Sequence, residues 1–597
     1  MHLIETIVSG TKYVYANECI YHRKTGKSNN LAKCIGKINE KKEFVPNKFL
    51  KQILLGNIST PVSLSNYEKL ILDTAIAKYG HDMLIKAREP DEDAKVLKVI
   101  HTAQPIRYGP QLIFGDISKT YGLENMLAEA FGDEIARDIL ALSWFITAEG
   151  SALSNNDSWL SYYENPRGGG ISSQDVTRLL DNINFDGMTT FYKLWLKRIG
   201  GKTDKTEKIL YDLTSISYYG KRIPEAEFGH NRDKEHLPQV NYALLCIRST
   251  GMPLFAWPMN GSISDIVTLE TTLEFLLKLG YRPNCLMMDR GFGSRTNISF
   301  MFTKKHTFLQ TLKTSSVWVH DIIDFQRNER FLPHNQFEMG NQTYYATTTD
   351  CKWVIYRDKS KKDSPQRIIV YHCRKRGEHY AGEDGKIGKI ECVDQYPCKA
   401  HVFFCQDLVG SQFDRFMKNL GVEYERLIAD EKAVPKKEFM KYFCIERKKY
   451  ARKRTVEYIN ERILEYKDKY AGYICYLTND PTIKTAEDAL KEYSTRDQIE
   501  KDFDELKNAE DMKRLRVWDG DRMRSRLFIQ FIAEIHMREL CTRLRTSKEC
   551  IKLTKTQISN HIKTICKIKF KGKYRDVKHP FTKSQRDIIN AMGISPP

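Results

Sequence analysis

The chain has 597 residues, which is too long for a single hydrophobic core, so several domains are expected. Hydrophobic residues make up 41% of the chain, which is typical of a folded protein. Lysine and arginine exceed aspartate and glutamate by 95 − 76 = 19, which suggests a polyanionic partner such as nucleic acid. The N-terminus lacks the features of a signal peptide, and no apolar run approaches the roughly 20 residues of a membrane span, so we expect a cytosolic or nuclear protein.

The first third of the chain divides into a β-rich part and a helical part. Apolar and polar residues alternate around Tyr13–Tyr15 and again around Cys34–Ile38, which predicts a basic β-hairpin module over residues 1–55. The spacing is helical over residues 56–204, where two short helices are predicted around a turn at Gly187. We interpret this part as a helical DNA-binding region. The two short helices are either a helix-turn-helix reader or an ordinary pair in a bundle.

Residues 205–314 alternate between strand and helix patterns. Lys208–Ser217 is predicted as a strand with Asp212 near its middle, and two more strands and a helix follow. The apolar strand Cys285–Met288 then ends on Asp289. This order is that of a ribonuclease-H-like core, in which the first and fourth strands lie side by side. We therefore predict an α/β fold with a mixed sheet whose first half is this segment.

The remaining sequence departs from this core and then returns to it. Residues 315–470 are predicted as a β-rich insertion domain that interrupts the core, and residues 471–545 as the second half of the core, with a strand and an acidic helix. Residues 546–597 form a basic C-terminal region, since positions 551–580 hold nine lysines and arginines and a single acidic residue. Basic runs beside a carboxylate site favour contact with a phosphate backbone.

The acidic helix is predicted over Tyr493–Lys507, which contains no proline or glycine. One stripe of this helix carries polar residues at helical spacing, namely Tyr493, Arg496, Glu500 and Lys507. For an arbitrary helix, a solvated face with an ion pair between Arg496 and Glu500 is the ordinary interpretation. Asp504, one turn beyond Glu500, is the alternative carboxylate on this helix.

Three carboxylates that come together would need a counter-charge. If Asp212, Asp289 and Glu500 converge within about 5 Å, each pair repels by about 3 kcal/mol at an effective dielectric constant of ~20. Divalent cations relieve this repulsion, and oxygen ligands favour Mg²⁺, with Mn²⁺ as a substitute. Two ions about 3.5–4 Å apart can activate a water or a 3′-hydroxyl for attack on a phosphodiester.

The basic members of the helical stripe then gain a function in this interpretation. Arg496 can form two hydrogen bonds to one phosphate, Lys507 can supply a point charge, and Tyr493 can donate its hydroxyl. Because Tyr493 and Lys507 would lie about 21 Å apart along a helix axis, they could hold a DNA strand along its path.

The spacing Tyr493-x2-Arg496-x3-Glu500-x6-Lys507 resembles the Tyr-Arg-Glu-Lys signature of the insertion-sequence-four superfamily of bacterial DDE transposases. The sequences around Asp212 (YDLTSIS), around Asp289 (LMMDRGF) and before the helix (ICYLTND) also resemble this family. The likeness extends over most of the chain and is weakest over about 315–440 and after 545.

The resemblance implies cut-and-paste transposition by a ribonuclease-H-like enzyme with two Mg²⁺ ions. It assigns catalysis and metal binding to Asp212, Asp289 and Glu500, and contact with the transposon end to Tyr493, Arg496 and Lys507. The implied partners are double-stranded DNA, as terminal inverted repeats and target, and a second copy of the chain in a synaptic homodimer, with no membrane and no small-molecule substrate. The implied location is the cytoplasm, at the nucleoid.

Relatives in this family form a DNA hairpin with a flipped base stacked on an aromatic residue. Four aromatic residues are candidates for this role in the present chain, and no position matches clearly: Trp353, Tyr473, Tyr476 and Trp518. Two other functions remain as alternatives, a metal-dependent nuclease of the same fold and a domesticated DNA-binding protein without catalysis.

Overall fold

A computed structural model describes residues 1–597 except 23–25, 41, 60–64, 81–98, 151–152, 201–205, 230–234, 264, 359–367, 372–389, 437, 447–453, 495–514, 516, 571–574 and 596–597. The chain forms two compact units. The smaller unit contains Met1–Pro105 and Ile568–Lys578, and the larger unit contains Ile106–Lys567 and His579–Pro597. Each unit is described by itself below.

The smaller unit is built on an antiparallel sheet with the strand order β1-β2-β3-β4. The strands are β1 (His2–Val8), β2 (Thr11–His22), β3 (Lys27–Ile38) and β4 (Phe44–Pro46), and the helices are α1 (Lys48–Ser59) and α2 (Asn66–Tyr79). Side chains of both helices join those of the strands in one apolar core. The predicted hairpin is confirmed as β2 and β3, and the compact unit extends beyond the 55 residues of the predicted module.

Most described strands of the larger unit belong to one mixed sheet, in the order β11-β12-β14-β17-β10-β9-β6-β7-β8. One half consists of β6 (Lys208–Ser217), β7 (Gln239–Ile247), β8 (Pro253–Asn260), β9 (Cys285–Met288) and β10 (Phe308–Thr311). In this half β6, β7 and β8 are antiparallel, whereas β9 is parallel to both β6 and β10. The helices α11 (Asp265–Lys278) and α12 (Arg295–Thr303) connect β8 to β9 and β9 to β10. The predicted strands are therefore present, and the first and fourth of them are neighbours.

The other half of the sheet comes from the segment that was predicted as an insertion. It consists of β17 (Tyr473–Thr478), β14 (Ile390–Phe404), β12 (Gln342–Asp358) and β11 (Gln336–Met339), and β13 (Ile368–Tyr371) also pairs with β12. Because β17 pairs with both β10 and β14, the hydrogen bonding continues without a break from one half to the other. The sheet therefore gives no separation at residue 315 or 470, and those predicted boundaries stay predictions.

Several further elements lie before, between and after the strands of this second half in the sequence. They are α13 (Val317–Gln326), α14 (Asp407–Ala429), the hairpin β15 (Phe443–Glu446) and β16 (Thr455–Tyr458), α15 (Asn460–Lys469) and α16 (Ala486–Ser494). Gly472, just before β17, has a φ of +85°, and a Cβ there would lie 2.9 Å from the Phe404 ring and 3.0 Å from the Cys405 carbonyl oxygen. Only glycine fits this entry into the strand without strain.

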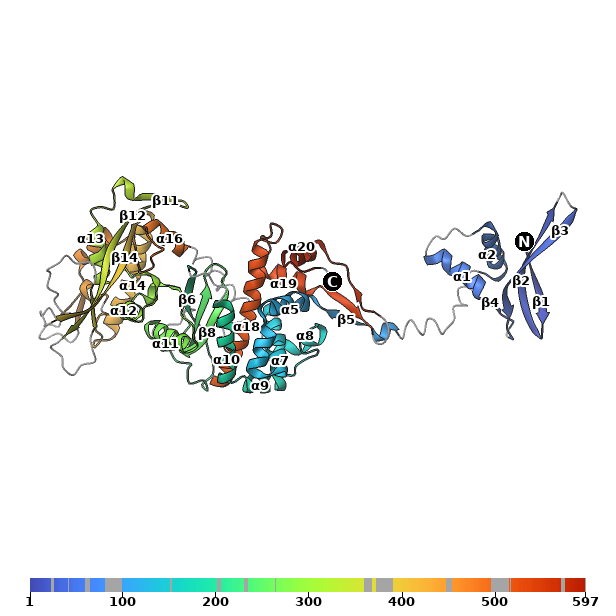
Figure 1. Cartoon of the computed structure of the whole chain (residues 1–597), viewed down its shortest axis with the longest axis horizontal. Coiled ribbons are helices and arrows are strands. Elements are labelled where there is room, and N and C mark those ends of the chain that lie inside the picture. Colours follow the sequence, from blue (N-terminus) through green and yellow to red (C-terminus); the bar gives the residue numbers. More distant parts are fainter. Residues whose placement is uncertain are drawn as a thin grey trace. The chain divides into compact units, whose positions relative to one another are not determined.

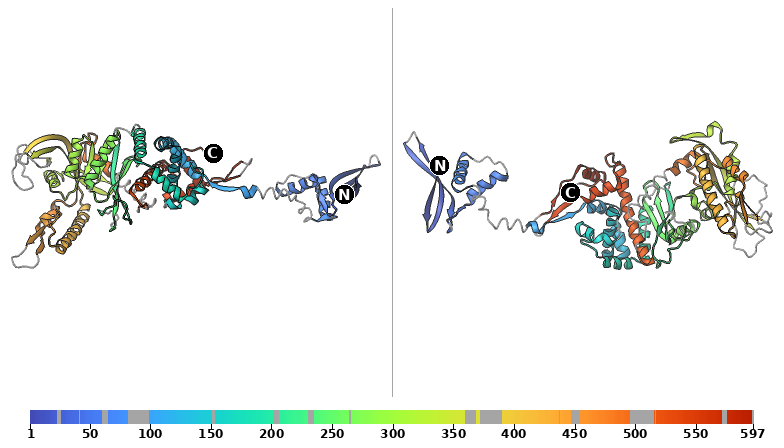
Figure 2. Two further views of the ribbon diagram at one scale, coloured as in Figure 1. Left: turned by 90° about the horizontal axis from the view of Figure 1, so that it is seen from below. Right: turned by 180° about the vertical axis from the view of Figure 1, so that it is seen from behind.

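A helical bundle packs against β8 in the same unit, through α10 and α18 (Figure 1). Its helices are α5 (Gly109–Tyr121), α6 (Leu123–Phe131), α7 (Asp133–Glu149), α8 (Asn156–Tyr162), α9 (Ser173–Asn182), α10 (Phe185–Gly200), α18 (Gly520–Arg545), α19 (Lys555–Lys563) and α20 (Lys583–Ala591). α18 contacts both α7 and β8, and Figure 2 shows this helix from two further directions. The short strands β5 (Gln104–Arg107), β18 (Cys566–Lys569) and β19 (Val577–Lys578) belong neither to this bundle nor to the large sheet.

The two short helices predicted around Gly187 correspond to α9 and α10, but the turn between them lies at residues 183–184, and Gly187 is in the first turn of α10. α10 is hydrogen-bonded to the sheet. The Tyr192 hydroxyl donates a 2.8 Å hydrogen bond to the Ala256 carbonyl, and the Trp195 indole donates one of 3.0 Å to the Pro253 carbonyl. These buried contacts favour the ordinary helical pair over a helix-turn-helix, because a recognition helix presents its reading face to the DNA groove.

A buried carboxyl in α18 predicts an unusual dependence of stability on pH. Burial raises the pKa of Glu534 to about 7, and the nearby charge of Arg538 offsets only part of this effect. The folded protein therefore loses stability as pH rises from the ordinary glutamate pKa towards 7. We expect Glu534→Gln to raise the free energy of unfolding by about 3 kcal/mol above pH 7 and to change it little near pH 4. Thermal unfolding of both proteins between pH 4 and 9 checks this, and an equal gap at every pH would contradict it.

No helix in the described ranges combines the length and the apolar character that crossing a membrane requires.

Candidate functional site

Two predicted site residues, Asp212 and Asp289, are neighbours across parallel strands. The pairing of β6 with β9 places Leu210 opposite Met287 and Tyr211 opposite Met288. The next step of the same register places Asp212 opposite Asp289, which follows the last residue of β9. Neighbouring strands lie about 4.8 Å apart, so the two carboxylates project from adjacent backbones. The polypeptide thus brings together residues separated by the whole of β7, β8 and α11.

The two aspartates have similar local hydrogen bonding. The backbone N–H of Leu213 donates a 2.8 Å bond to Asp212 Oδ1, and that of Arg290 donates a 2.6 Å bond to Asp289 Oδ1. Gln310 Nε2 also donates to the Asp289 carbonyl, at 2.8 Å. Both side chains are half-buried. Each carboxylate is therefore held by the backbone N–H of the next residue and is not fully buried in the core.

Both aspartates point to the face of the sheet that α16 covers. Side chains alternate between faces along a strand, so Asp212 and Asp289 share a face with Leu210 and Met287, two residues earlier. These two apolar residues belong to a core cluster that also contains Ala486, Ala489 and Leu490 of α16. α16 leads into the stretch predicted as the acidic helix. The carboxylates and α16 therefore lie on one side of the sheet.

The described residues on either side of 495–514 lie at opposite ends of β6. Before this stretch, Glu492 forms an ion pair with Arg248, whose backbone N–H donates to the Lys208 carbonyl at the first residue of β6. After it, the Leu515 N–H donates a 3.1 Å bond to the carbonyl of Ser217, the last residue of β6. The chain between them must therefore connect the two ends of the strand that carries Asp212.

A buried ion pair fixes the position of the segment before α16. Lys208 Nζ contacts the Asp480 carboxylate and donates a 2.9 Å hydrogen bond to the Thr482 hydroxyl. Burial acts to raise the pKa of Asp480, but the hydrogen bonds from Lys208 and Thr482 outweigh it and hold this pKa below its ordinary value. Sequence reasoning missed this pair, although a lysine that opens an otherwise apolar strand was a usable signal.

Of the remaining predicted site residues, the structure describes only Tyr493. Tyr493 lies in the last turn of α16, with its ring centroid 5.0 Å from that of Tyr476 in β17. Arg496, Glu500 and Lys507 lie outside the described residues. Within the described part of the chain, no group of three or more His, Cys, Asp and Glu side chains is placed to hold a metal ion. Of the three predicted ligands, the structure describes Asp212 and Asp289, and their role as ligands stays a prediction.

Among the four aromatic candidates for base stacking, the structure separates one from the others. Trp353, Tyr473 and Tyr476 are no more than 2% exposed, whereas Trp518 is 68% exposed. The Arg222 guanidinium lies 6.0 Å from the Trp518 ring centroid. Only Trp518 thus offers a ring surface to a nucleobase, and it lies three residues after Leu515, which is bonded to the end of β6.

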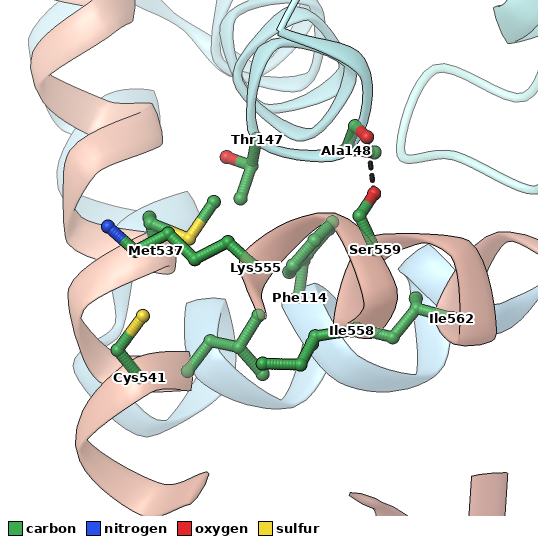
Figure 3. A pocket seen from close by; sticks show the side chains of 10 residues that line it. Phe114, Thr147, Ala148, Met537, Cys541, Lys555, Ile558, Ser559 and Ile562 are labelled. Atoms are coloured by element: carbon green, nitrogen blue, oxygen red, sulfur yellow. Dashed lines mark hydrogen bonds between the residues drawn. The ribbon is translucent and has the colours of Figure 1, made fainter. Parts of the chain in front are cut away.

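A small cavity in the helical bundle contains none of the predicted site residues. It lies among α5, α7, α18 and α19, and its lining is mainly apolar (Figure 3). The Ser559 hydroxyl donates to the carbonyl of Ala148 at its rim. This cavity is a packing defect between helices and not part of the carboxylate site.

Comparisons with known proteins give only weak structural similarity. Neither a protein-family model nor a curated protein matches the chain. Among solved structures, it is similar to the piggyBac transposase in a synaptic complex with hairpin DNA, with a TM-score of 0.24 and 13% sequence identity. The match covers 48% of this chain and 66% of that transposase chain, just under two thirds of its length. A TM-score this low supports no conclusion about fold or function.

Proposed function

We propose that the chain is a DDE transposase with a ribonuclease-H-like core, of the insertion-sequence-four type, which cuts and joins DNA at terminal inverted repeats. The observation that carries this proposal is the register that sets Asp212 beside Asp289 on parallel strands β6 and β9. The strand order β8-β7-β6-β9-β10, with antiparallel β6, β7 and β8, supports the same core. The proposed partners are double-stranded DNA and a second copy of the chain, in the cytoplasm at the nucleoid.

The donor set of this site fits a hard divalent cation. Two carboxylates about 5 Å apart repel by about 3 kcal/mol at an effective dielectric constant of ~20, and a divalent ion between them removes that cost. Both donors are oxygens, which suit Mg²⁺ and Mn²⁺. Asp212 and Asp289 would hold the ions, and Glu500 is the proposed third ligand. Bound Mg²⁺ would activate a water or a 3′-hydroxyl and stabilise the leaving oxygen of a phosphodiester.

The length of the sequence between the ends of β6 supports the choice of Glu500. β6 spans nine residue steps from Lys208 to Ser217, which is about 30 Å and equals the rise of about 20 helical residues. Asp212 is four steps from Lys208, about 13 Å, or about nine helical residues. Counting nine residues on from Glu492 reaches position 501, beside Glu500. This count is consistent with Glu500 as the third ligand on the helix that the sequence predicts over Tyr493–Lys507.

The other residues of the predicted stripe would position the DNA. Arg496 would form paired hydrogen bonds to a backbone phosphate, and Lys507 would add a point charge further along the strand. Tyr493 would donate its hydroxyl to a third phosphate. If a flipped base forms, Trp518 is the proposed stacking partner because its ring is exposed.

A strand-transfer assay distinguishes this proposal from its alternatives. Inverted repeats in the DNA that flanks the gene would supply the substrate, a fragment that ends in one repeat. Incubated with the protein, Mg²⁺ and a supercoiled plasmid, this fragment should become joined to the plasmid. A nuclease of the same fold would cut without joining, and a domesticated DNA-binding protein would retain the fragment without changing it.

A further inference from the structure

A row of three cations and two tyrosines lies at one end of the large sheet. Lys441 Nζ is 5.7 Å from the Tyr470 ring centroid, and the Arg327 guanidinium carbon is 5.5 Å from the same ring. Arg327 is also 6.0 Å from the Tyr473 ring, which lies 5.2 Å from the Arg330 guanidinium carbon. The two tyrosines thus link Lys441, Arg327 and Arg330 into one continuous group, which we call the cation–tyrosine row.

The cation–tyrosine row lies at the same end of the sheet as the aspartates. β10 pairs Gln310 with Met288 and, on its other side, Thr311 with Tyr476. Tyr473 is therefore two strands and three residues from the position of Asp289, which corresponds to about 14 Å. Arg290, next to Asp289, also lies close enough to Tyr466 of α15 to oppose the effect of burial, which raises the pKa of that tyrosine. Tyr473 is three residues from Tyr476 and belongs to the core cluster of the other face, so the row lies across the sheet from the aspartates. A DNA strand that leaves the carboxylates would reach the row by passing around this end of the sheet.

Two cations of the row lack a carboxylate partner in the described part of the chain. No described Asp or Glu oxygen lies within 4.0 Å of the side-chain nitrogens of Arg330 or Lys441, whereas Arg327 pairs with Asp324. Arg330 is enclosed by three rings, since Phe331 and Phe404 lie 4.3 and 4.7 Å from its guanidinium carbon. Its Nε and Nη1 are buried, and neither forms a hydrogen bond.

Such cations are costly to keep without an anion. Burial lowers the pKa of Arg330 and of Lys441, and for Lys441 the nearby charges of Glu465 and Asp324 offset part of this effect. Cation–π contacts with the aromatic rings stabilise the charged forms by about 0.5–2 kcal/mol for each pair, which offsets part of the desolvation of the cations. An anionic ligand would stabilise the charged forms further through hydrogen bonds, because a charge-assisted hydrogen bond is roughly twice as strong as a neutral one.

We propose that the cation–tyrosine row binds the phosphate backbone of a DNA strand as it leaves the carboxylate site. This inference rests on the proposed function, because the location of the row matters only if DNA lies at Asp212 and Asp289. A DNA strand carries a charge at regular intervals, which a row of cations can follow without reading sequence. The rings of Tyr470 and Tyr473 are only 6% and 2% exposed, so the contacts to DNA would come from the cations and not from the rings. Arg330 would donate to one phosphate and Lys441 to another, with Arg327 between them.

Salt-dependent DNA binding by the full chain tests this proposal. Affinity for a labelled duplex of about 40 base pairs is measured in EDTA, which prevents cleavage, at several salt concentrations. Arg330→Met and Lys441→Met should each bind about tenfold more weakly at low salt and lower the slope of log K against log[salt] by about 0.9. Arg330→Lys keeps the charge and should largely retain the slope. Arg462→Met is the control, because Arg462 on α15 already pairs with Glu465.

The outcomes separate this inference from the proposed function. Unchanged slopes in folded Arg330→Met and Lys441→Met proteins would overturn the cation–tyrosine row as a DNA surface, while DNA joining by the wild-type protein would stand. Reduced slopes together with no cleavage or joining in Mg²⁺ would support the row and overturn the transposase. If Arg330→Met does not fold, Lys441→Met alone decides the question.

Discussion

Replacing Asp289 or Asp212 with asparagine should lower the rate of DNA cleavage at element ends by about a thousandfold or more, which corresponds to at least ~4 kcal/mol of activation free energy. Asparagine keeps the volume of the side chain and its oxygen acceptor, so the backbone hydrogen bonds from Leu213 and Arg290 can persist. The negative charge that neutralises a divalent ion is lost. Cleavage of a labelled fragment in Mg²⁺ measures this effect.

DNA binding provides the control for both aspartate variants. Because phosphate contacts are assigned to other residues, Asp289→Asn and Asp212→Asn should bind the same fragment at least as tightly as the wild-type chain in EDTA. Asp181→Asn is a matched change in a carboxylate that pairs with Arg522, outside both the proposed metal site and the cation–tyrosine row. Cleavage by Asp289→Asn at the wild-type rate would remove Asp289 from the proposed catalytic set.

Breaking the buried ion pair between Lys208 and Asp480 should destabilise the larger unit by about 3–5 kcal/mol. Both side chains are about 5% exposed, so Lys208→Met leaves the Asp480 charge in the core without its main partner. Thermal unfolding measures the loss. The double variant Lys208→Met/Asp480→Leu should recover much of it, because a well-packed apolar pair replaces both charges. The exposed pair of Lys491 with Glu487 is the control, and Lys491→Met should change little.

The same ion pair predicts a dependence on pH. The lowered pKa of Asp480 contributes stability that is present above the ordinary aspartate pKa, about 3.9, and is lost as pH falls through the folded-state value. The gap between wild-type and Lys208→Met proteins should therefore be full at pH 7 and shrink below about pH 4. A gap that is constant down to pH 3 would show that Lys208 acts through packing and not through the charge of Asp480.

Local sequence patterns predict much of the first half of the sheet. The strand predicted over Lys208–Ser217 has the bounds of β6, and Cys285–Met288 those of β9, because both are apolar runs that stop at polar or turn residues. The position of Asp289 after a strand was therefore visible in the sequence. That β6 and β9 pair in parallel was predictable from the order strand, strand, strand, helix, strand, because parallel strands need a connection long enough to cross the sheet.

Long-range pairing was not predictable in the same way. The hydrogen bonds from β17 to β14 and from β14 to β12 join the two halves of the sheet, and no periodicity within a strand specifies its neighbour. The ion pair of Lys208 with Asp480 joins positions 272 residues apart. The cation–tyrosine row has the same character, because it combines the residues after α13, the segment from the end of α15 to the start of β17, and the turn before β15. Such groups become visible only when the fold brings them together.

Mn²⁺ binding by the full chain tests most directly whether Asp212, Asp289 and Glu500 form one metal site. Electron paramagnetic resonance reports the free ion during a titration of wild-type, Asp289→Asn, Glu500→Gln and double-variant proteins. The account predicts that each single variant weakens Mn²⁺ binding and that the double variant adds little, because the two residues share the same ion. Asp504→Asn should bind like the wild type. Mn²⁺ affinity that is unchanged in Glu500→Gln, or lost instead in Asp504→Asn, would contradict the proposed site.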